Sequence, residues 1–308
     1  MLHRLTLLSL CMLCGVVGVA PLAQGQVLVP HTVAPDAKQL QQTGLALLRE
    51  ALQLAQFQQF EPALARAKLA TQLVPKTEEA WALLGGLYLS TDKLDLGIQA
   101  LERALTINPK NPGVHFSLGS AYFRKANYTA AERVLLAGLK LKPDVTEALF
   151  DLGNTYLKLN RFNEAIAAYR KAVAKDQKFW PALNNIGLVH YEQGKVNDAI
   201  QNWKAAIAVD EKAATEAKLA MAVALYTQGQ KEQGLELAAS ALTADRRYGE
   251  VAFLQENLWG DRLIADTKVI LATPKVRDTL AQSADMAPAI ASPPNPAPSP
   301  NRPGPTAP

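Results

Sequence analysis

The sequence predicts an all-α protein, a solenoid of helix-turn-helix repeats that ends in a C-terminal capping helix. Three observations predict this fold class. Ala, Leu, Gln, Glu and Lys, which favour helix, abound, whereas aromatic residues make up only 6% of the 308 residues. Small residues recur every 34 positions through the middle of the chain. Pro and Gly stand between the apolar stretches, where helices are expected to end.

The N-terminus has the three-part pattern of a secretory signal peptide over residues 1–25. Arg4 precedes an apolar stretch over residues 5–20, and a small-x-small motif ends at Gly25. We therefore expect cleavage and export across the cytoplasmic membrane, to a periplasm, a lumen or the exterior. The alternative is an uncleaved N-terminal anchor, with membrane association through residues 5–20. Pro21 shortens the apolar stretch below the roughly 20 residues that a membrane span prefers.

Charge and cysteine content argue against several classes of function. The net charge is +4, but basic and acidic residues are interspersed, so we expect no nucleic-acid partner. Cys11 and Cys14 both lie in the predicted leader. The mature chain would then lack cysteine, which excludes disulfides, thiol catalysis and thiolate metal sites.

Several columns of equivalent residues share the 34-residue period. One column contains Gly85, Gly119, Gly153 and Gly187, each preceded by Leu or Ile. Three residues after each glycine stands Tyr or, in the last case, His190, and twelve residues after it stands Gly or Ala. Independent columns with one period indicate a repeat architecture in which neighbouring units stack.

This period divides the chain into five parts. Residues 26–43 form a linker after the leader. Six repeats follow, at residues 44–77, 78–111, 112–145, 146–179, 180–213 and 215–248. Residues 249–283 form the capping helix region, in which Val251, Leu254 and Leu258 make an apolar stripe. Residues 284–308 are rich in Pro and Ala and predict a disordered tail.

Each repeat is expected to be a pair of antiparallel helices in close contact. A side chain larger than a methyl group in the glycine column would hold the helices apart, so Gly153→Leu should cost about 1–3 kcal/mol. Between the paired helices, Asn127, Asn160, Gly194 and Gly229 are expected to adopt positive φ.

The repeats resemble the tetratricopeptide repeat family, most closely in WALLGGLYLS at residues 81–90. Trp81, Leu84, Gly85 and Tyr88 match the family pattern W-x2-L-G-x2-Y. The resemblance covers about 44–248. It implies a right-handed solenoid in which the first helix of each repeat lines a concave groove.

The resemblance also implies which residues would contact a protein or peptide in this groove. They are Phe116, Phe123, Arg124, Phe150, Asn154, Lys158, Asn184, Asn185 and Tyr191. Asn154 and Asn185 match columns that hold a peptide backbone in the family, since an amide both donates and accepts hydrogen bonds. The alternative is that Asn is common in these columns whether or not a partner binds. Phe150 replaces a clamp lysine, which favours an apolar or mixed segment over an acidic C-terminus.

No catalytic or metal-ligating motif emerges from the sequence. His190 occupies a repeat column, so we expect it in a helix seam, and no H-E-x-x-H, Walker A or G-x-S-x-G pattern is present. We predict a non-catalytic scaffold without cofactor or metal, acting in the assembly of membrane or envelope complexes. The alternatives are a self-associating repeat protein, with monomer or homo-oligomer left open, and an accessory subunit of an enzyme.

Overall fold

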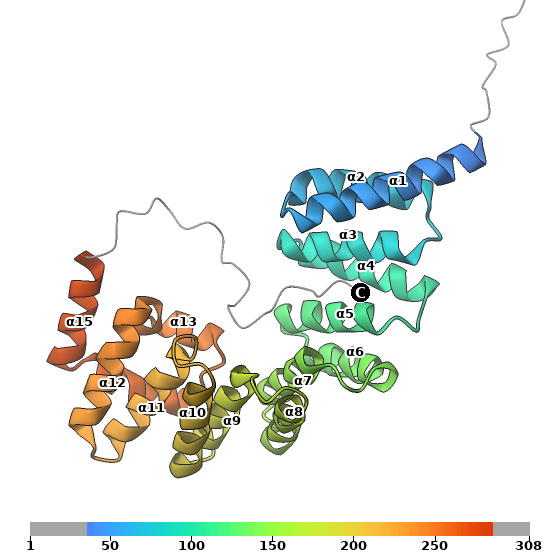
Figure 1. The fold of residues 1–308 in the computed structure, drawn as a ribbon. Helices are drawn as coiled ribbons and strands as arrows, with labels where there is room; N and C mark the ends of the chain where they lie inside the picture. The colour runs from blue at the N-terminus through green and yellow to red at the C-terminus, as the bar shows by residue number, and fades with distance from the viewer. Residues whose placement is uncertain (1–35, 286–308) are drawn as a thin grey trace, which may run out of the picture.

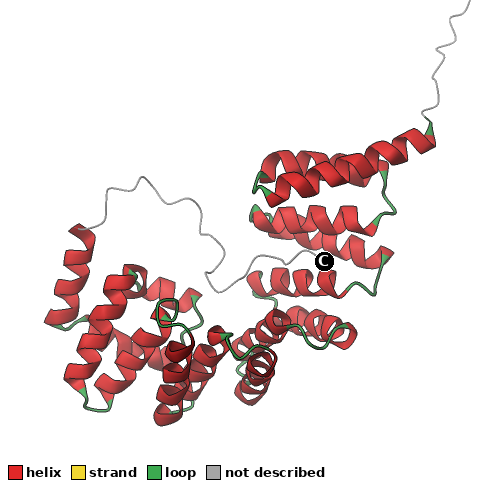
Figure 2. Ribbon diagram, in the orientation of Figure 1, coloured by secondary structure: helices red, strands yellow, loops and turns green. Residues whose placement is uncertain are grey.

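The computed structural model describes residues 36–285, and within them the regular secondary structure is entirely helical (Figures 1 and 2). The all-α prediction is confirmed. The predicted leader or anchor at 1–25, residues 26–35 of the linker and residues 286–308 of the tail lie outside the described residues. No helix of the described part combines the length and the apolar character needed to cross a membrane.

Six helix pairs stack one after another to form the solenoid (Figure 1). They are α1 (Ala37–Gln56) with α2 (Phe60–Leu73), α3 (Glu78–Ser90) with α4 (Leu94–Ile107), α5 (Pro112–Arg124) with α6 (Tyr128–Leu141), α7 (Thr146–Lys158) with α8 (Phe162–Lys175), α9 (Trp180–Glu192) with α10 (Val196–Val209), and α11 (Thr215–Thr227) with α12 (Lys231–Ala244). The first helices of repeats two to six begin where the sequence period places those repeats.

Helix α1 begins earlier than the sequence period suggests. Residues 37–43, expected in the linker, already belong to this helix. The side chain of Asp36 caps it by accepting a hydrogen bond from Lys38 N at 2.9 Å. No Pro or Gly interrupts residues 37–43, so the helix extends back to this cap.

In each of repeats two to five, a large side chain of the second helix lies over the glycine of the first. A Cβ on Gly85 would lie 2.6 Å from Leu101 Cγ, and one on Gly119 equally close to Leu135 Cγ. Tyr169 and Trp203 cover the equivalent glycines of repeats four and five. A side chain therefore fills most of the space that we expected the helix backbones to occupy.

The left-handed turn positions follow the repeat period. Positive φ occurs at Gln58, Asp92, Ala126, Asn160, Gly194 and Gly229. The prediction is confirmed for Asn160, Gly194 and Gly229 and is wrong by one residue in repeat three. There Ala126 has the positive φ, and Asn127 caps α6 by accepting a hydrogen bond from Ala130 N at 3.2 Å.

The C-terminal region contains several helical segments where the sequence predicted one capping helix. They are a 3-10 turn (Arg246–Gly249), α13 (Val251–Glu256), α14 (Asp261–Leu271) and α15 (Pro274–Asp285). Helix α15 packs on α12 and seals the end of the solenoid. The predicted stripe is broken because α13 ends at Glu256 and Leu258 adopts φ 70°.

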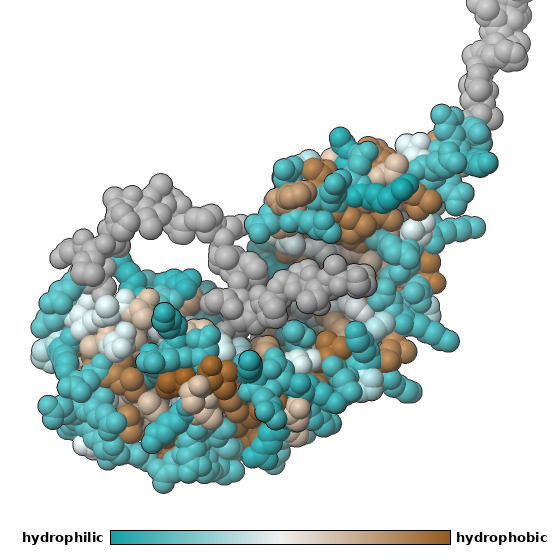
Figure 3. All heavy atoms as spheres, viewed as in Figure 1, coloured by the Kyte–Doolittle hydropathy of each residue, from teal (hydrophilic) through white to brown (hydrophobic). Residues whose placement is uncertain are grey.

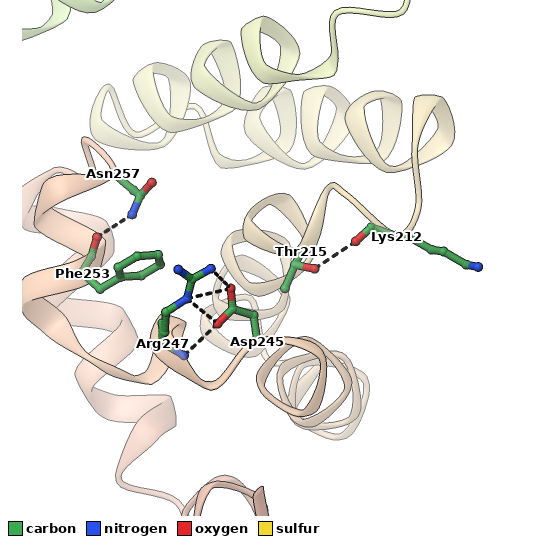
Figure 4. A network of polar contacts seen from close by, with 6 residues as sticks. All are labelled: Lys212, Thr215, Asp245, Arg247, Phe253 and Asn257. Atoms are coloured by element: carbon green, nitrogen blue, oxygen red, sulfur yellow. Dashed lines mark hydrogen bonds and ion pairs between the residues drawn. The ribbon is translucent and has the colours of Figure 1, made fainter. Parts of the chain in front are cut away.

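A salt-bridged turn redirects the chain after α12 (Figure 4). Arg247 Nη2 lies 2.6 Å from Asp245 Oδ2, and the guanidinium carbon lies 4.9 Å from the centre of the Phe253 ring. Asn257 Nδ2 donates to Phe253 O at 2.7 Å, at the end of α13. These contacts hold the short α13 against the turn and set the direction in which the chain continues to α14.

Candidate functional site

The groove floor is exposed or partly exposed over the first three repeats. Here the groove-lining faces of α1, α3 and α5 include aliphatic and phenylalanine side chains and Gly86, beside polar residues such as Arg124. We call this surface the open groove, made of Leu45, Leu52, Leu83, Gly86, Leu89, Phe116 and Phe123. Leu45 and Leu52 are 36% and 44% exposed, and the others are partly exposed. Figure 3 shows hydrophobic groups among hydrophilic ones on this stack.

The same groove positions are buried over repeats five and six. We call this part the closed groove, made of Asn184, Asn185, Leu188 and Tyr191 of α9 and Glu216, Leu219, Ala220 and Val223 of α11. Each of these residues is at most 3% exposed. Asn184 and Asn185 are buried against repeat four, where Asn185 bonds to Asn154. Over the rest of the closed groove the cover belongs to the chain itself, because α14 packs against both α9 and α11.

Polar contacts attach this cover at three points. The Glu192 carboxylate accepts hydrogen bonds from the backbone N–H groups of Arg262 at 3.2 Å and Leu263 at 3.0 Å, at the start of α14. The Tyr191 hydroxyl donates to Asp266 Oδ2 at 2.7 Å. Trp259 Nε1 donates to Glu216 Oε1 at 2.9 Å.

Tyr191 was predicted to face a bound partner, but its hydroxyl group is held by α14. Burial, followed by the hydrogen bond to Asp266, raises the pKa of Tyr191 above its ordinary value. The hydroxyl therefore stays protonated and keeps donating across the physiological range.

Asn154 and Asn185 bind one another where the sequence suggested contact with a peptide backbone. Asn154 Oδ1 accepts from Asn185 Nδ2 at 2.9 Å and from the Tyr169 hydroxyl at 2.7 Å. Asn184 Nδ2 donates to Asn185 Oδ1 at 3.2 Å, whereas Asn184 Oδ1 has no hydrogen-bond partner among the described residues. A buried tyrosine hydroxyl needs a hydrogen-bond acceptor, and Asn154 supplies one to Tyr169, whose ring covers Gly153.

Phe150 and Arg124 are also engaged within the chain. The Phe150 ring lies 5.3 Å from that of Phe179 and 5.6 Å from that of Tyr169, inside the core of repeats four and five. Arg124 pairs with Asp92 at 2.7 Å and donates to the backbone carbonyl of Leu89 at 3.0 Å, so it braces the turn of the preceding repeat.

The predicted groove residues therefore fall into separate groups. Phe116 and Phe123 are partly exposed in the open groove, with the Phe116 ring against Gly138 and the Phe123 ring 5.3 Å from that of Tyr128, and Lys158 is exposed at the end of α7. Phe150, Asn154 and the Asn184–Asn185 pair form a buried cluster between repeats four and five, and Tyr191 lies under α14. Of the nine residues, five are buried, because α14 covers Tyr191 and the other four pack together with Tyr169 of α8 between repeats four and five.

His190 lies in a helix seam, as its repeat column predicts. It is 7% exposed, and its Nδ1 lies 3.3 Å from Asn202 Nδ2. Burial lowers the pKa of His190, so the imidazole is favoured in its neutral form. Within residues 36–285 no group of three His, Cys, Asp or Glu side chains is placed to hold a metal ion.

Sequence reasoning missed the segment that binds Glu192 and Glu216. The partner is the segment Trp259–Leu271, whose stripe of Leu263, Ile264 and Ile270 is an ordinary amphipathic pattern. Such a pattern indicates a buried helix face without indicating the surface that it covers. The sequence did contain one indication that this part of the groove is covered. The groove positions of α11 are unusually apolar, with Leu219, Ala220 and Val223.

Two family models match the chain. The tetratricopeptide repeat domain of cytochrome c-type biogenesis protein H matches residues 26–177, and a general tetratricopeptide repeat model matches residues 184–257. No curated protein matches the chain.

Solved structures of similar fold are repeat proteins of the same kind. The chain is 18% identical to PilF of Pseudomonas aeruginosa, with a TM-score of 0.57 over 71% of this chain and 97% of PilF. It is 24% identical to MamA, with a TM-score of 0.50 over 53% of this chain and 95% of MamA. YrrB, described as having an unusual peptide-binding site, is 20% identical, with a TM-score of 0.51 over 56% and 90%. These likenesses support the fold.

Proposed function

Because the chain belongs to the tetratricopeptide repeat family, we propose that it is a scaffold that binds an apolar segment of another protein in the open groove. The observation that carries this proposal is the contrast along the groove floor. Repeats five and six cover their apolar positions with α14. By contrast, the first repeat leaves Leu45 and Leu52 of α1 more than one third exposed, and the open-groove residues of repeats two and three are partly exposed. Contiguous apolar positions in a concave surface are typical of interaction sites.

The chemistry of the open groove favours an apolar ligand held without covalent steps. Each square ångström of apolar surface that the partner buries contributes roughly 25 cal/mol. Phe123 and Phe116, the latter packed over Gly138 of α6, are partly exposed rings that lose little conformational freedom on binding, as is common for anchors at protein interfaces. Gly86 leaves room between them and α1, since a Cβ there would meet no atom within 4 Å. Recognition of this kind needs neither a cofactor nor a catalytic residue.

The family match suggests a setting for this binding. The first four repeats match the repeat domain of a cytochrome c biogenesis protein, so the partner we favour is a polypeptide handled during cytochrome c maturation. The predicted leader would bring the scaffold to the outer side of the cytoplasmic membrane, where envelope complexes are assembled.

The test is to fill the open groove without disturbing the fold. Gly86→Trp places a large ring over the groove floor, and Gly86→Ala at the same position is the matched control. Crosslinking and pulldown from the native compartment should recover a foreign partner with wild type and the Ala variant, and much less of it with the Trp variant.

Thermal unfolding must give similar melting temperatures for both variants, because a Cβ at residue 86 would meet no atom within 4 Å. Undiminished recovery of every partner by Gly86→Trp would overturn the proposal. Recovery of this chain alone would favour self-association in its place.

A further inference from the structure

We propose that the closed groove over repeats five and six is a helix-binding site in its own right and that α14 is its resident ligand. A helix of the same chemistry would then bind these repeats in trans once α14 is released. This inference goes beyond the proposed function, which concerns the open groove of repeats one to three.

The first argument is that the solenoid does not need α14 to close its end. Helix α15 and the 3-10 turn at Arg246–Gly249 already pack on α12, the last helix of the repeats. Helix α14 packs across α9 and α11, which belong to different repeats. Its position is that of a ligand in the concave face, and its contacts are additional to the stacking that stabilises a solenoid.

The second argument is that the polar contacts recognise features of a helix. Glu192 accepts hydrogen bonds from two N–H groups in the first turn of α14, which have no partner within the helix. A carboxylate there is also favoured by the helix dipole. One turn further along α14, the Tyr191 hydroxyl donates a hydrogen bond to the carboxylate of Asp266. The Arg262 guanidinium lies 5.2 Å from the centre of the Tyr191 ring.

The third argument is the amphipathic character of α14. Leu263, Ile264 and Ile270 are at most 5% exposed and join one core with the apolar residues of the closed groove. Val269, on the other face of the helix, is 56% exposed. An apolar stripe at helical spacing that lies in a groove is a recurring mode of peptide recognition.

The connections of α14 to α13 and α15 are short. Before it, Leu258 adopts φ 70°, a conformation that is unfavourable for a leucine, and Gly260 lies against Glu192. After it, Ala272 and Thr273 separate it from α15. The ligand class follows from these contacts: a helix with two adjacent aliphatic residues near its N-terminus, a third aliphatic residue two turns later, and an acidic residue between them.

The experiment uses the full chain and a fluorescent synthetic peptide of residues 257–273. A double variant, Leu263→Asp with Ile264→Asp, places two charges on the buried face and should release α14 in cis. The labelled peptide should then bind this variant saturably and at least tenfold more tightly than it binds wild type. Val269→Asp, a change of the same kind on the exposed face, is the matched control and should behave as wild type does.

Two further variants test the specificity. Adding Tyr191→Phe to the double variant removes the hydroxyl that holds Asp266 and should weaken peptide binding severalfold. Adding Gly86→Trp blocks the open groove and should leave peptide binding unchanged, so failure here is distinguishable from failure of the proposed function. If the double variant retains its helical circular dichroism and does not bind the peptide, the inference is overturned.

If the double variant does not fold, Gly260→Val takes its place. A Cβ at residue 260 would overlap the Glu192 carboxylate and detach only the start of α14. Hydrogen exchange should then accelerate within residues 262–271, and it should accelerate further when peptide is added, because the peptide takes the place of α14 in the groove. Unchanged exchange, or faster exchange that extends equally through α11 and α12, would show that α14 and the groove are one structural unit and would overturn the inference.

Discussion

The first three repeats and the last two share one period and one pair of helices per unit, yet their groove faces differ. In repeats one to three the groove positions are partly exposed, and the buried residues form small separate clusters. In repeats five and six the same positions belong to one large core that continues through α13, α14 and α15. The role of a repeat position is therefore decided by what lies across from it as well as by its place in the period.

The side chains that cover the glycine column become larger toward the C-terminus, where the groove is closed. Leu101 and Leu135 cover the glycines of repeats two and three, whereas Tyr169 and Trp203 cover those of repeats four and five. Each larger ring brings a polar group into the core and therefore needs a partner. Tyr169 donates to Asn154, and Trp203 Nε1 donates to the backbone carbonyl of Asn184 at 3.2 Å.

The largest expected difference between the two regions comes from truncating a side chain in each. Trp203 is fully buried, so Trp203→Ala should destabilise the protein by about 3–5 kcal/mol. Leu52 is 44% exposed, and Leu52→Ala should change stability by less than about 0.5 kcal/mol. Urea unfolding followed by circular dichroism measures both, and equal losses would contradict the contrast.

Glycine substitutions sharpen the comparison at matched positions. Gly187→Leu places a side chain where the Trp203 ring lies and should cost about 1–3 kcal/mol. Gly86→Leu meets empty space, and because leucine favours helix over glycine it should stabilise by up to about 1 kcal/mol. Opposite shifts in melting temperature are expected, and a loss in both variants would show that the open groove is filled.

Two tyrosine hydroxyl groups offer a smaller and more local comparison. Tyr191→Phe removes the buried hydrogen bond to Asp266 and should cost about 0.5–1.5 kcal/mol, with faster hydrogen exchange in α14. Tyr122 donates to Glu102 at 2.5 Å on a more exposed surface, and Tyr122→Phe should cost less. If Tyr191→Phe costs less than Tyr122→Phe, the hydrogen bond to Asp266 contributes little, and α14 is held mainly by its apolar contacts.

The smallest effect concerns the pH dependence of the closed region. Burial keeps the pKa of His190 below its ordinary value of 6.5, so the unfolded chain binds a proton more readily there than the folded chain does. This contribution to stability is complete above pH 6.5 and is lost as the pH falls through the lower folded pKa. His190→Gln should therefore reduce the fall in melting temperature between pH 7.5 and pH 5.5. An unchanged pH profile would exclude His190 as the cause.

The fold was largely predictable from the sequence, and the groove contacts were predictable only in part. The glycine column and the turn residues report on contacts within one repeat, and these depend on local sequence. Asn154, Asn185 and Tyr191 also lie in the predicted columns. However, Asn154 bonds to Asn185 and to Tyr169 of α8, and Tyr191 bonds to α14, so their partners lie in other parts of the sequence. A repeat period describes how each unit packs on the next and contains no information on a later segment that folds back over the stack.

The bond between the Trp259 indole and Glu216 gives the molecule an optical signal of its own. The indole is 4% exposed and lies at the junction between α13 and α14. When this junction opens, the ring enters water and its fluorescence should shift toward longer wavelengths. Substituting the three other tryptophans by phenylalanine would leave one emitter, and stopped-flow mixing could then time the opening in solution without any attached label.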